Sequence, residues 1–179
     1  MSQARLFQRA LKYAQRSPEW YQARHNILTS SEIASILDSN NYESAENMLL
    51  RKCKPLSLTN TTHLATEWGE KYEPIAKQIF KQLTNLDVTD IGLVVSEKYP
   101  FIGASPDGVV QDGRLIEIKC PYIRRINPTT YPFQYWIQMQ IQLEVCDIDE
   151  NYFFQCEFEE DPMNFISKHK YHTQFQGVL

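Results

Sequence analysis

Paired cysteines are missing from this sequence. Its four cysteines, Cys53, Cys120, Cys146 and Cys156, include no C-x-x-C pair, so a zinc tetrad of the usual spacing is not indicated. The sequence also shows no signal peptide and no long apolar run. We therefore expect a reduced, intracellular protein without a membrane partner.

An excess of positive charge is missing as well. Lysine and arginine number 18 against 22 aspartates and glutamates, which gives a formal net charge of −4 and a pI of about 5.6. A protein that coats nucleic acid through its bulk charge is normally basic, so this role is disfavoured. A local groove can still be basic. Arg51, Lys52 and Lys54 form one cluster that fits either a DNA backbone or the end of a solvated helix.

Internal repeats and linkers are also absent. The chain has 179 residues, enough to bury a core in one domain and short for two. A hydrophobic content of 42% with 12% aromatic residues is typical of a folded protein rather than a disordered one. We expect a single domain over residues 1–179.

Two short motifs bring acidic groups close together in the sequence. Residues 105–108 read Ser-Pro-Asp-Gly, and residues 117–121 read Glu-Ile-Lys-Cys-Pro. Alternation over Arg114–Cys120 predicts a strand with Glu117 and Lys119 on one face. Two carboxylates suit Mg2+, which cleaves phosphodiesters by activating a water that an ammonium group can orient. The alternative is a surface strand with an ordinary ion pair.

The predicted hairpin raises a difficulty for a metal site. A turn at Asp112-Gly113 is expected to close a hairpin whose second strand carries Glu117. A strictly two-residue turn would pair Asp107 with Ile118, so that Asp107 faces away from Glu117. A shared metal site therefore requires a longer loop, a bulge or a bend, and Gly108 is the obvious place for one.

These motifs resemble the PD-(D/E)XK nucleases and, among them, the lambda-type exonucleases, or YqaJ-like viral recombinases. Those enzymes typically show a Trp-x-x-x-Arg element followed by small hydroxyl residues, a Gly-x-x-x-Glu helix, Ser-Pro-Asp-Gly, a Glu-x-Lys-Cys-Pro strand and a Gln-x-Gln helix. This sequence has all of them in order: Trp20 and Arg24 with Thr29, Ser30 and Ser31; Gly69 and Glu73; Ser105 to Gly108; Glu117 to Pro121; Gln138 and Gln140. Chance easily explains any one element, but not the whole ordered set.

The resemblance implies an α/β fold with a small mixed central β-sheet flanked by helices, the restriction-endonuclease-like core. It implies a Mg2+-dependent 5′-to-3′ exonuclease that acts on double-stranded DNA and makes 3′ single strands for recombination and repair in a phage or large DNA virus. A viral protein would work in the host cytoplasm or nucleus. The family also suggests a trimeric ring and a single-strand annealing protein as partner.

Two other functions stay open. A structure-specific or restriction-type endonuclease on the same core would cut closed circular DNA. A non-catalytic adaptor would bind DNA or protein without cutting. The presence of Asp107, Glu117 and Lys119 together argues against an adaptor.

The resemblance assigns metal binding and water activation to four residues. Asp107 and Glu117 would bind the metal, with the backbone carbonyl of Ile118 as a further ligand. The ion would be Mg2+ or Mn2+, with two ions per site. Lys119 would position or activate the attacking water.

Further roles follow from the same resemblance. Glu73 would contribute to the second metal's shell, and Gln138 would orient a metal-bound water or the substrate. Arg24 would hold the 5′-phosphate through its planar guanidinium, with Ser31 nearby and Trp20 in the same DNA-contacting set. Alternatively, Arg24 merely packs its stem on Trp20.

Helix-start signals surround the early arginine. Ser17-Pro18 predicts a helix that carries Trp20 and Arg24 on one face. Thr29 and Glu32 have the spacing of a capping box, which gives Thr29 a structural role that competes with ligand binding.

A long amphipathic helix is predicted over Leu64–Leu83. Pro74 falls in its middle, so we expect a kink or a break there. Glu73 would be displayed at that kink. Its alternative role is an ion pair with Lys77 one turn later.

The remaining elements include one ambiguous segment. Residues 133–145 alternate as a strand would but consist of helix formers, and we predict a helix because of the resemblance. Strands are predicted at Ile91–Ser96, Phe101–Ala104 and Tyr152–Phe158. A terminal helix is predicted over Pro162–Leu179.

Overall fold

The computed structural model describes residues 3–56, 63–160 and 166–177. The helices in these residues are α1 (Gln3–Arg9), α2 (Pro18–His25), α3 (Ser30–Ile36), α4 (Ala45–Cys53), α5 (Leu64–Thr84) and α6 (Phe133–Cys146). The strands are β1 (Leu28–Thr29), β2 (Val88–Thr89), β3 (Val94–Val95), β4 (Ile102–Ala104), β5 (Gly108–Val110), β6 (Leu115–Lys119), β7 (Glu150–Glu160) and β8 (Ile166–Gly177).

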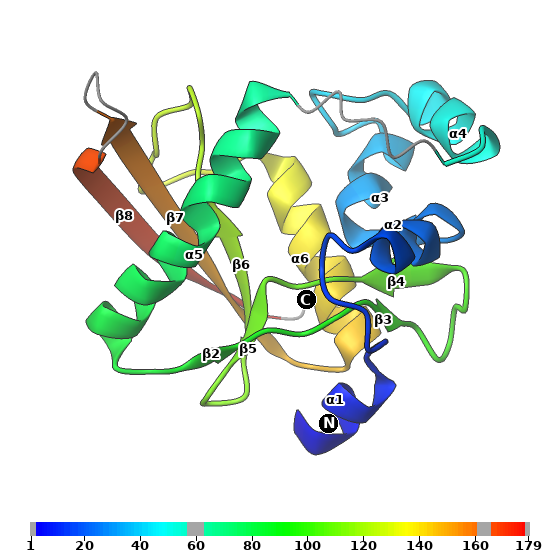
Figure 1. Cartoon of the computed structure of the whole chain (residues 1–179), viewed down its shortest axis with the longest axis horizontal. Helices are drawn as coiled ribbons and strands as arrows, with labels where there is room; N and C mark the ends of the chain where they lie inside the picture. The colour runs from blue at the N-terminus through cyan, green and yellow to red at the C-terminus, as the bar shows by residue number, and fades with distance from the viewer. Residues whose placement is uncertain (1–2, 57–62, 161–165, 178–179) are drawn as a thin grey trace.

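The strands form two sheets (Figure 1). The larger one has five strands in the order β2-β5-β6-β7-β8; β6 and β7 run parallel, and the other neighbours run antiparallel. The smaller one has the order β1-β4-β3 and also mixes both directions. The predicted α/β class with a mixed sheet between helices is confirmed.

Helix α5 covers one face of the larger sheet. Tyr72, Ala76 and Phe80 follow one another at four-residue spacing, so they form one buried stripe that packs on the β6 and β7 side chains. Figure 1 shows the helix crossing in front of these strands. The helix runs through Pro74 without interruption, so the break considered at this proline is absent. Packing of the stripe on both sides of Pro74 holds the helix together where one backbone hydrogen bond is lost.

Helix α6 covers the opposite face. Leu143 and Val145 pack in one cluster with Leu115 of β6 and with Leu6 of α1. The prediction of a helix over Phe133–Val145 is confirmed. The alternating pattern was misleading because the helix is buried almost all round, with apolar and glutamine side chains both inside the protein.

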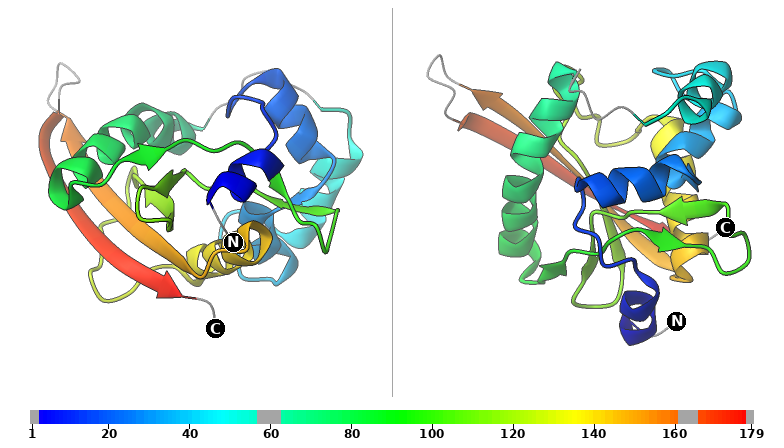
Figure 2. Two further views of the ribbon diagram at one scale, coloured as in Figure 1. Left: turned by 90° about the horizontal axis from the view of Figure 1, so that it is seen from below. Right: turned by 45° about the vertical axis from the view of Figure 1, so that its right-hand side comes forward.

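The prediction of a terminal helix is wrong for the described part of the tail. Residues 166–177 form β8, which pairs antiparallel with β7 along most of its length (Figure 2). Residues 162–165 and 178–179 of the predicted helix lie outside the described residues. Strand β7 would otherwise present a long row of unpaired backbone groups, and pairing with β8 satisfies them.

The other predicted elements are present with shifted ends. Strands β3 and β4 are shorter than the predicted Ile91–Ser96 and Phe101–Ala104, and β7 is longer than the predicted Tyr152–Phe158. In the described residues, no helix combines the length and the apolar character needed to cross a membrane.

Candidate active site

A three-residue loop closes the hairpin between β5 and β6. The Gly113 amide donates to the Val110 carbonyl at 2.9 Å, and the Val110 amide donates to the Arg114 carbonyl at 2.8 Å. Gly113 has a φ of 98°, a left-handed conformation that suits glycine. The loop therefore spans residues 111–113, and the two-residue turn considered from the sequence is wrong.

This loop length sets the register that a shared metal site requires. Gly108 pairs with Ile116, the last pair of the ladder at this end. Asp107, the next residue, departs from the regular ladder: its amide donates to the Ile116 carbonyl at 3.1 Å and its Oδ2 accepts from the Ile118 amide, so the residue lies alongside Glu117. The chain also bends at Asp107, directly before Gly108 begins β5, so the irregularity predicted near Gly108 occurs together with the longer loop. Only glycine fits at position 108, because a Cβ there would lie 2.4 Å from the Val88 side chain of β2.

Glu117 is the acid of the site whose hydrogen bonds fix it most fully. Its side chain is 1% exposed. Oε1 accepts from Gln138 Nε2 at 2.7 Å and lies 2.5 Å from Lys119 Nζ, while Oε2 accepts from Gln142 Nε2 at 2.6 Å. These contacts fix both the position and the rotation of the carboxylate.

The support of Glu117 extends one residue further. Gln142 Oε1 accepts from Asn151 Nδ2 at 3.0 Å, and both side chains are fully buried. Asn151 lies on β7, next to Leu115 in the parallel pairing with β6. A buried amide that both donates and accepts in fixed partners has only one orientation, so Gln142 presents its NH2 group to the acid.

Asp107 lies beside this carboxylate, just before β5. Its Oδ2 accepts from the Ile118 amide at 2.6 Å. Burial raises the pKa of Asp107 well above its usual range, and the negative charges of Glu117 and Glu73 raise it further. The ionised form of Asp107 is therefore disfavoured, and an additional positive charge beside it would stabilise that form.

Lys119 completes the motif on the face predicted for it. Besides its contact with Glu117, its ammonium lies 5.0 Å from the centre of the Tyr135 ring. Burial alone would lower the pKa of Lys119, but Glu117 and Asp107 raise it above the usual value. These acids favour the charged form of the side chain, which can donate hydrogen bonds.

Glu73 approaches the same cluster from α5. It forms the expected ion pair with Lys77, at 3.1 Å, and a second one with Arg16, at 2.5 Å. Its charge also contributes to the raised pKa of Asp107. Glu73 therefore forms the ion pair with Lys77 and also lies at the acid cluster, so the two placements considered for it are compatible.

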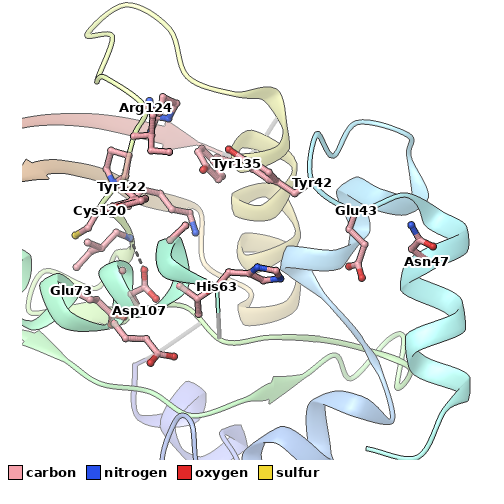
Figure 3. A pocket seen from close by; sticks show the side chains of 18 of the residues that line it. Tyr42, Glu43, Asn47, His63, Glu73, Asp107, Cys120, Tyr122, Arg124 and Tyr135 are labelled. Carbon is pink, nitrogen blue, oxygen red and sulfur yellow. Dashed lines mark hydrogen bonds between the residues drawn. The ribbon is translucent and has the colours of Figure 1, made fainter. Parts of the chain in front are cut away.

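These residues open into a cleft of about 1230 Å³. Glu73, Asp107 and Lys119 line it, together with Tyr42 and with Asn47 of α4. Figure 3 shows Asp107 and Glu73 facing the space below Tyr122 and Tyr135, with Glu43 and Asn47 across from them.

The donor set fits a hard divalent cation. Among the described residues, no three His, Cys, Asp or Glu side chains are arranged as a ready metal-binding group. Mg2+ does not need such a group, because it retains waters and takes one or two carboxylates along with substrate oxygens. Asp107 offers a carboxylate with unfavourable like charges around it, and Glu117 has used three of its roughly four lone-pair sites.

A second group of polar residues surrounds Arg24. Its guanidinium lies over the Trp20 ring, 4.3 Å from the ring centre, and donates to Thr29 Oγ1 at 3.3 Å and to Ser31 Oγ at 3.2 Å. Burial lowers the pKa of Arg24, while the charges of Glu32 and Glu117 oppose that change. The arginine therefore lies within electrostatic reach of the acid cluster.

Glu32 forms hydrogen bonds with Thr29 of this group and ion pairs with two basic residues of α4. It accepts from the backbone amide of Thr29 at 2.9 Å and from its hydroxyl at 2.8 Å, so the predicted capping box is confirmed. Arg51 and Lys52 both pair with Glu32. The basic cluster at the end of α4 thus turns partly inward, because the buried carboxylate needs counter-charges.

Comparison with known families agrees with the geometry. The family model described as the YqaJ-like viral recombinase domain matches residues 19–149, most of the chain. The chain belongs to this family. The matched region contains every motif from Trp20 to Gln140 and ends just before β7.

Relatives of this YqaJ-like chain occur in large DNA viruses. An uncharacterized protein of Acanthamoeba polyphaga mimivirus is 32% identical over 166 residues, which cover 83% of this chain and 30% of that protein. A protein of African swine fever virus is 30% identical over 161 residues, with 70% of this chain and 44% of that protein covered. The chain therefore spans less than half the length of these relatives.

Solved structures share the fold. The alkaline exonuclease from Laribacter hongkongensis is 28% identical, with a TM-score of 0.73 over 90% of this chain and 82% of that one. The same enzyme has been crystallised with dAMP. A phage-related exonuclease from Haemophilus somnus, at 16% identity and a TM-score of 0.59, agrees in fold.

Some site residues of this YqaJ-like chain were not expected from its motifs. Gln142 and Asn151 support Glu117, and Arg16 pairs with Glu73. A signal for Gln142 existed, because it follows Gln138 by one helical turn and must share its face. Nothing in the sequence indicated Arg16 or Asn151, whose contacts depend on tertiary structure.

Proposed function

We propose that this protein is a Mg2+-dependent deoxyribonuclease, specifically an exonuclease that digests double-stranded DNA in the 5′-to-3′ direction and leaves 3′ single strands for viral recombination. The hairpin carries the proposal, since Asp107 bonds the Ile116 carbonyl and the Ile118 amide, the backbone groups on either side of Glu117 in β6. Membership of the YqaJ-like family and the likeness to an alkaline exonuclease support it.

Asp107, Glu117 and the Ile118 carbonyl would hold the metal, with Glu73 contributing from α5. One or two Mg2+ ions, or Mn2+ in their place, would supply an activated water and neutralise the leaving oxygen. Glu117 keeps a fixed orientation through Gln138 and Gln142, so its free lone pair points in a constant direction. Lys119, whose charged form is favoured, would orient the water or donate to the phosphate.

Arg24 would bind the 5′-phosphate of the strand being digested. Its guanidinium is held flat against Trp20 and next to the Ser31 hydroxyl, so little side-chain freedom is lost when an anion binds. A planar guanidinium pairs with two phosphate oxygens at once. Binding of a terminal phosphate at this position would favour attack on DNA ends.

Digestion of three substrates tests this function. A linear duplex labelled at its 5′ ends, the same duplex labelled at its 3′ ends and a covalently closed circle are incubated with Mg2+, with Ca2+ and with EDTA. We expect early release of the 5′ label with Mg2+, an intact circle, and no cleavage in Ca2+ or EDTA, because Ca2+ takes a looser oxygen shell and activates water poorly. The Asp107→Asn variant serves as the inactive control.

Other outcomes identify the competing functions. Cleavage of the closed circle would indicate an endonuclease on the same core. Binding of DNA without cleavage in either Mg2+ or Mn2+ would indicate an adaptor. Early release of the 3′ label would reverse the proposed polarity.

A further inference from the structure

Arg16 adopts a backbone conformation that arginine rarely takes. It lies between α1 and α2 with a φ of 69°. The left-handed region brings a Cβ close to the following carbonyl oxygen, so it is unfavourable for arginine, whereas glycine enters it freely. The surrounding structure must therefore hold the residue there, and conformations of this kind concentrate at functional sites.

The turn around Arg16 is fastened to the acid cluster. The side-chain amide of the preceding residue, Gln15, donates to the Pro106 carbonyl at 3.0 Å and to the Ile91 carbonyl at 2.9 Å. Pro106 directly precedes Asp107 in the sequence. The backbone of Arg16 thus has a fixed place relative to the proposed metal ligands.

The guanidinium of Arg16 points at the acids. Nη2 lies 2.5 Å from Glu73 Oε2, and Nε lies 3.5 Å from Glu70 Oε1. Both glutamates line the cleft. The charge of Asp107 is close enough to act on the Arg16 guanidinium as well. The side chain remains 39% exposed, so solvent reaches it beside these two glutamates of the cleft.

Glu73 does not depend on Arg16 alone. Lys77 lies 3.1 Å from its other carboxylate oxygen and is less exposed than Arg16. Glu73 could therefore release Arg16 and keep a counter-charge. The released guanidinium would carry several free N–H donors next to the acid cluster, where a DNA phosphate has to come for cleavage.

We infer that Arg16 is a phosphate-binding residue beside the cleft, held by Glu73 until that carboxylate turns to a divalent cation. This inference rests on the proposed nuclease function. In the absence of DNA, Arg16 competes with the cation for Glu73 and weakens metal binding. Once Glu73 has exchanged partners, Arg16 binds a backbone phosphate, so that metal and DNA favour each other's binding.

Arg16→Gly is the informative variant, because glycine keeps the left-handed turn and removes only the side chain. Three quantities are measured: the melting temperature in EDTA, the Mn2+ affinity by calorimetry without DNA, and the duplex affinity in Ca2+ at several salt concentrations. Arg5→Ala is the matched control. It also removes one arginine with an ion pair, between Arg5 and Glu97 on the surface, away from the cleft residues.

We expect opposite changes in the two affinities of Arg16→Gly. Mn2+ should bind about threefold more tightly or better, because a competing positive charge is gone. Duplex DNA should bind about tenfold more weakly or worse, and the slope of log K against log salt should fall by about 0.9, the loss of one phosphate contact. The melting temperature should stay near that of the wild type, because the lost ion pair is offset by relief of the backbone conformation.

An unchanged salt slope, or weaker binding of both Mn2+ and DNA, would show that Arg16 only holds the structure in place. Arg5→Ala should leave both affinities near the wild-type values; if it matches Arg16→Gly, bulk charge explains the result and the inference is wrong. Wild-type cleavage with Mg2+ is measured in parallel. If the wild type cleaves while Arg16→Gly behaves as wild type, only the role of Arg16 fails. If the wild type neither binds nor cleaves DNA, the nuclease function and the role of Arg16 fail together.

Discussion

Gln142 donates a hydrogen bond of 2.6 Å to Glu117 Oε2 from the buried side of the site. The carboxylate is thereby held between two glutamines of α6, Gln138 on one oxygen and Gln142 on the other. Only Gln138 belongs to the Gln-x-Gln motif. The orientation of the proposed metal ligand thus depends partly on a residue outside the family's motifs.

Replacing Gln142 with leucine should reduce cleavage about ten- to a hundredfold, the usual cost of losing a residue that orients a metal ligand. Glu117 Oε2 loses its donor, and Asn151 loses its acceptor. The Mn2+ affinity measured by calorimetry should fall as well. Gln134→Leu is the matched control, because Gln134 is also buried on α6 and bonds the Asn41 amide instead of the acid. Equal losses of metal affinity in the two variants would argue against a positioning role for Gln142.

Replacing Asp107 with asparagine should abolish cleavage yet stabilise the metal-free protein. The asparagine oxygen can still accept from the Ile118 amide, while the unfavourable charge near Glu117 and Glu73 disappears. We therefore expect a higher melting temperature than that of the wild type in EDTA at pH 7.5. A lower melting temperature would mean that the carboxylate contributes to stability rather than to function.

The residues of this site could be predicted from the sequence better than their geometry. Asp107, Glu117 and Lys119 form a recognisable motif because their chemistry demands particular residue types. The hairpin register was uncertain, because Asp112-Gly113 fits a two-residue turn as well as the end of a three-residue loop. Only the backbone contacts around Gly113 decide between them.

The features that the sequence did not predict depend on contacts between residues far apart in the chain. The helix predicted in place of strand β8 is wrong because local propensity does not reveal that β7 offers an unpaired edge, with which β8 pairs. The conformation of Arg16 is equally invisible in the sequence, since it depends on contacts with Glu73 and on the neighbouring Gln15. Both features belong to tertiary structure rather than to periodicity.

Glu32→Gln should lower stability in a pH-dependent way. Burial alone would raise the pKa of Glu32, but hydrogen bonds from Lys52 and Thr29 lower it below the usual value. A lowered folded-state pKa gives stability that is present above the unfolded pKa and lost as the pH falls through the folded one. The variant should therefore be less stable by about 1.5–3 kcal/mol at pH 7.

The same difference should shrink once the pH falls below about 4.5, the ordinary pKa of glutamate, and continue to shrink through the folded-state pKa. Urea unfolding between pH 3 and 8 measures it. Glu46→Gln, at an exposed position of α4, is the control and should change stability little at any pH. A Glu32→Gln difference that stays constant down to pH 3 would contradict the assigned ion pairs.

The proposed role of Arg24 predicts a preference between two kinds of DNA end. If its guanidinium binds a terminal phosphate, a 5′-phosphorylated duplex should be digested faster than its 5′-hydroxyl counterpart. Loss of charge-assisted hydrogen bonds costs about 1.5–3 kcal/mol, so the preference should be about ten- to a hundredfold. Arg24→Ala should remove most of it and leave slow cleavage, because Asp107, Glu117 and Lys119 are untouched.

The structure also allows a purely packing role for Arg24, since its guanidinium covers the Trp20 ring and holds the Thr29 and Ser31 hydroxyls. Arg24→Lys separates the two roles. Lysine keeps the charge and much of the stem that packs on Trp20, but not the planar fork that pairs with phosphate oxygens. Phosphate recognition requires that the lysine variant melt near the wild type and still lose most of the preference. If instead both variants unfold at lower temperature while the ratio of the two digestion rates stays at its wild-type value, Arg24 is a packing residue, and the 5′-phosphate must be bound elsewhere in the cleft.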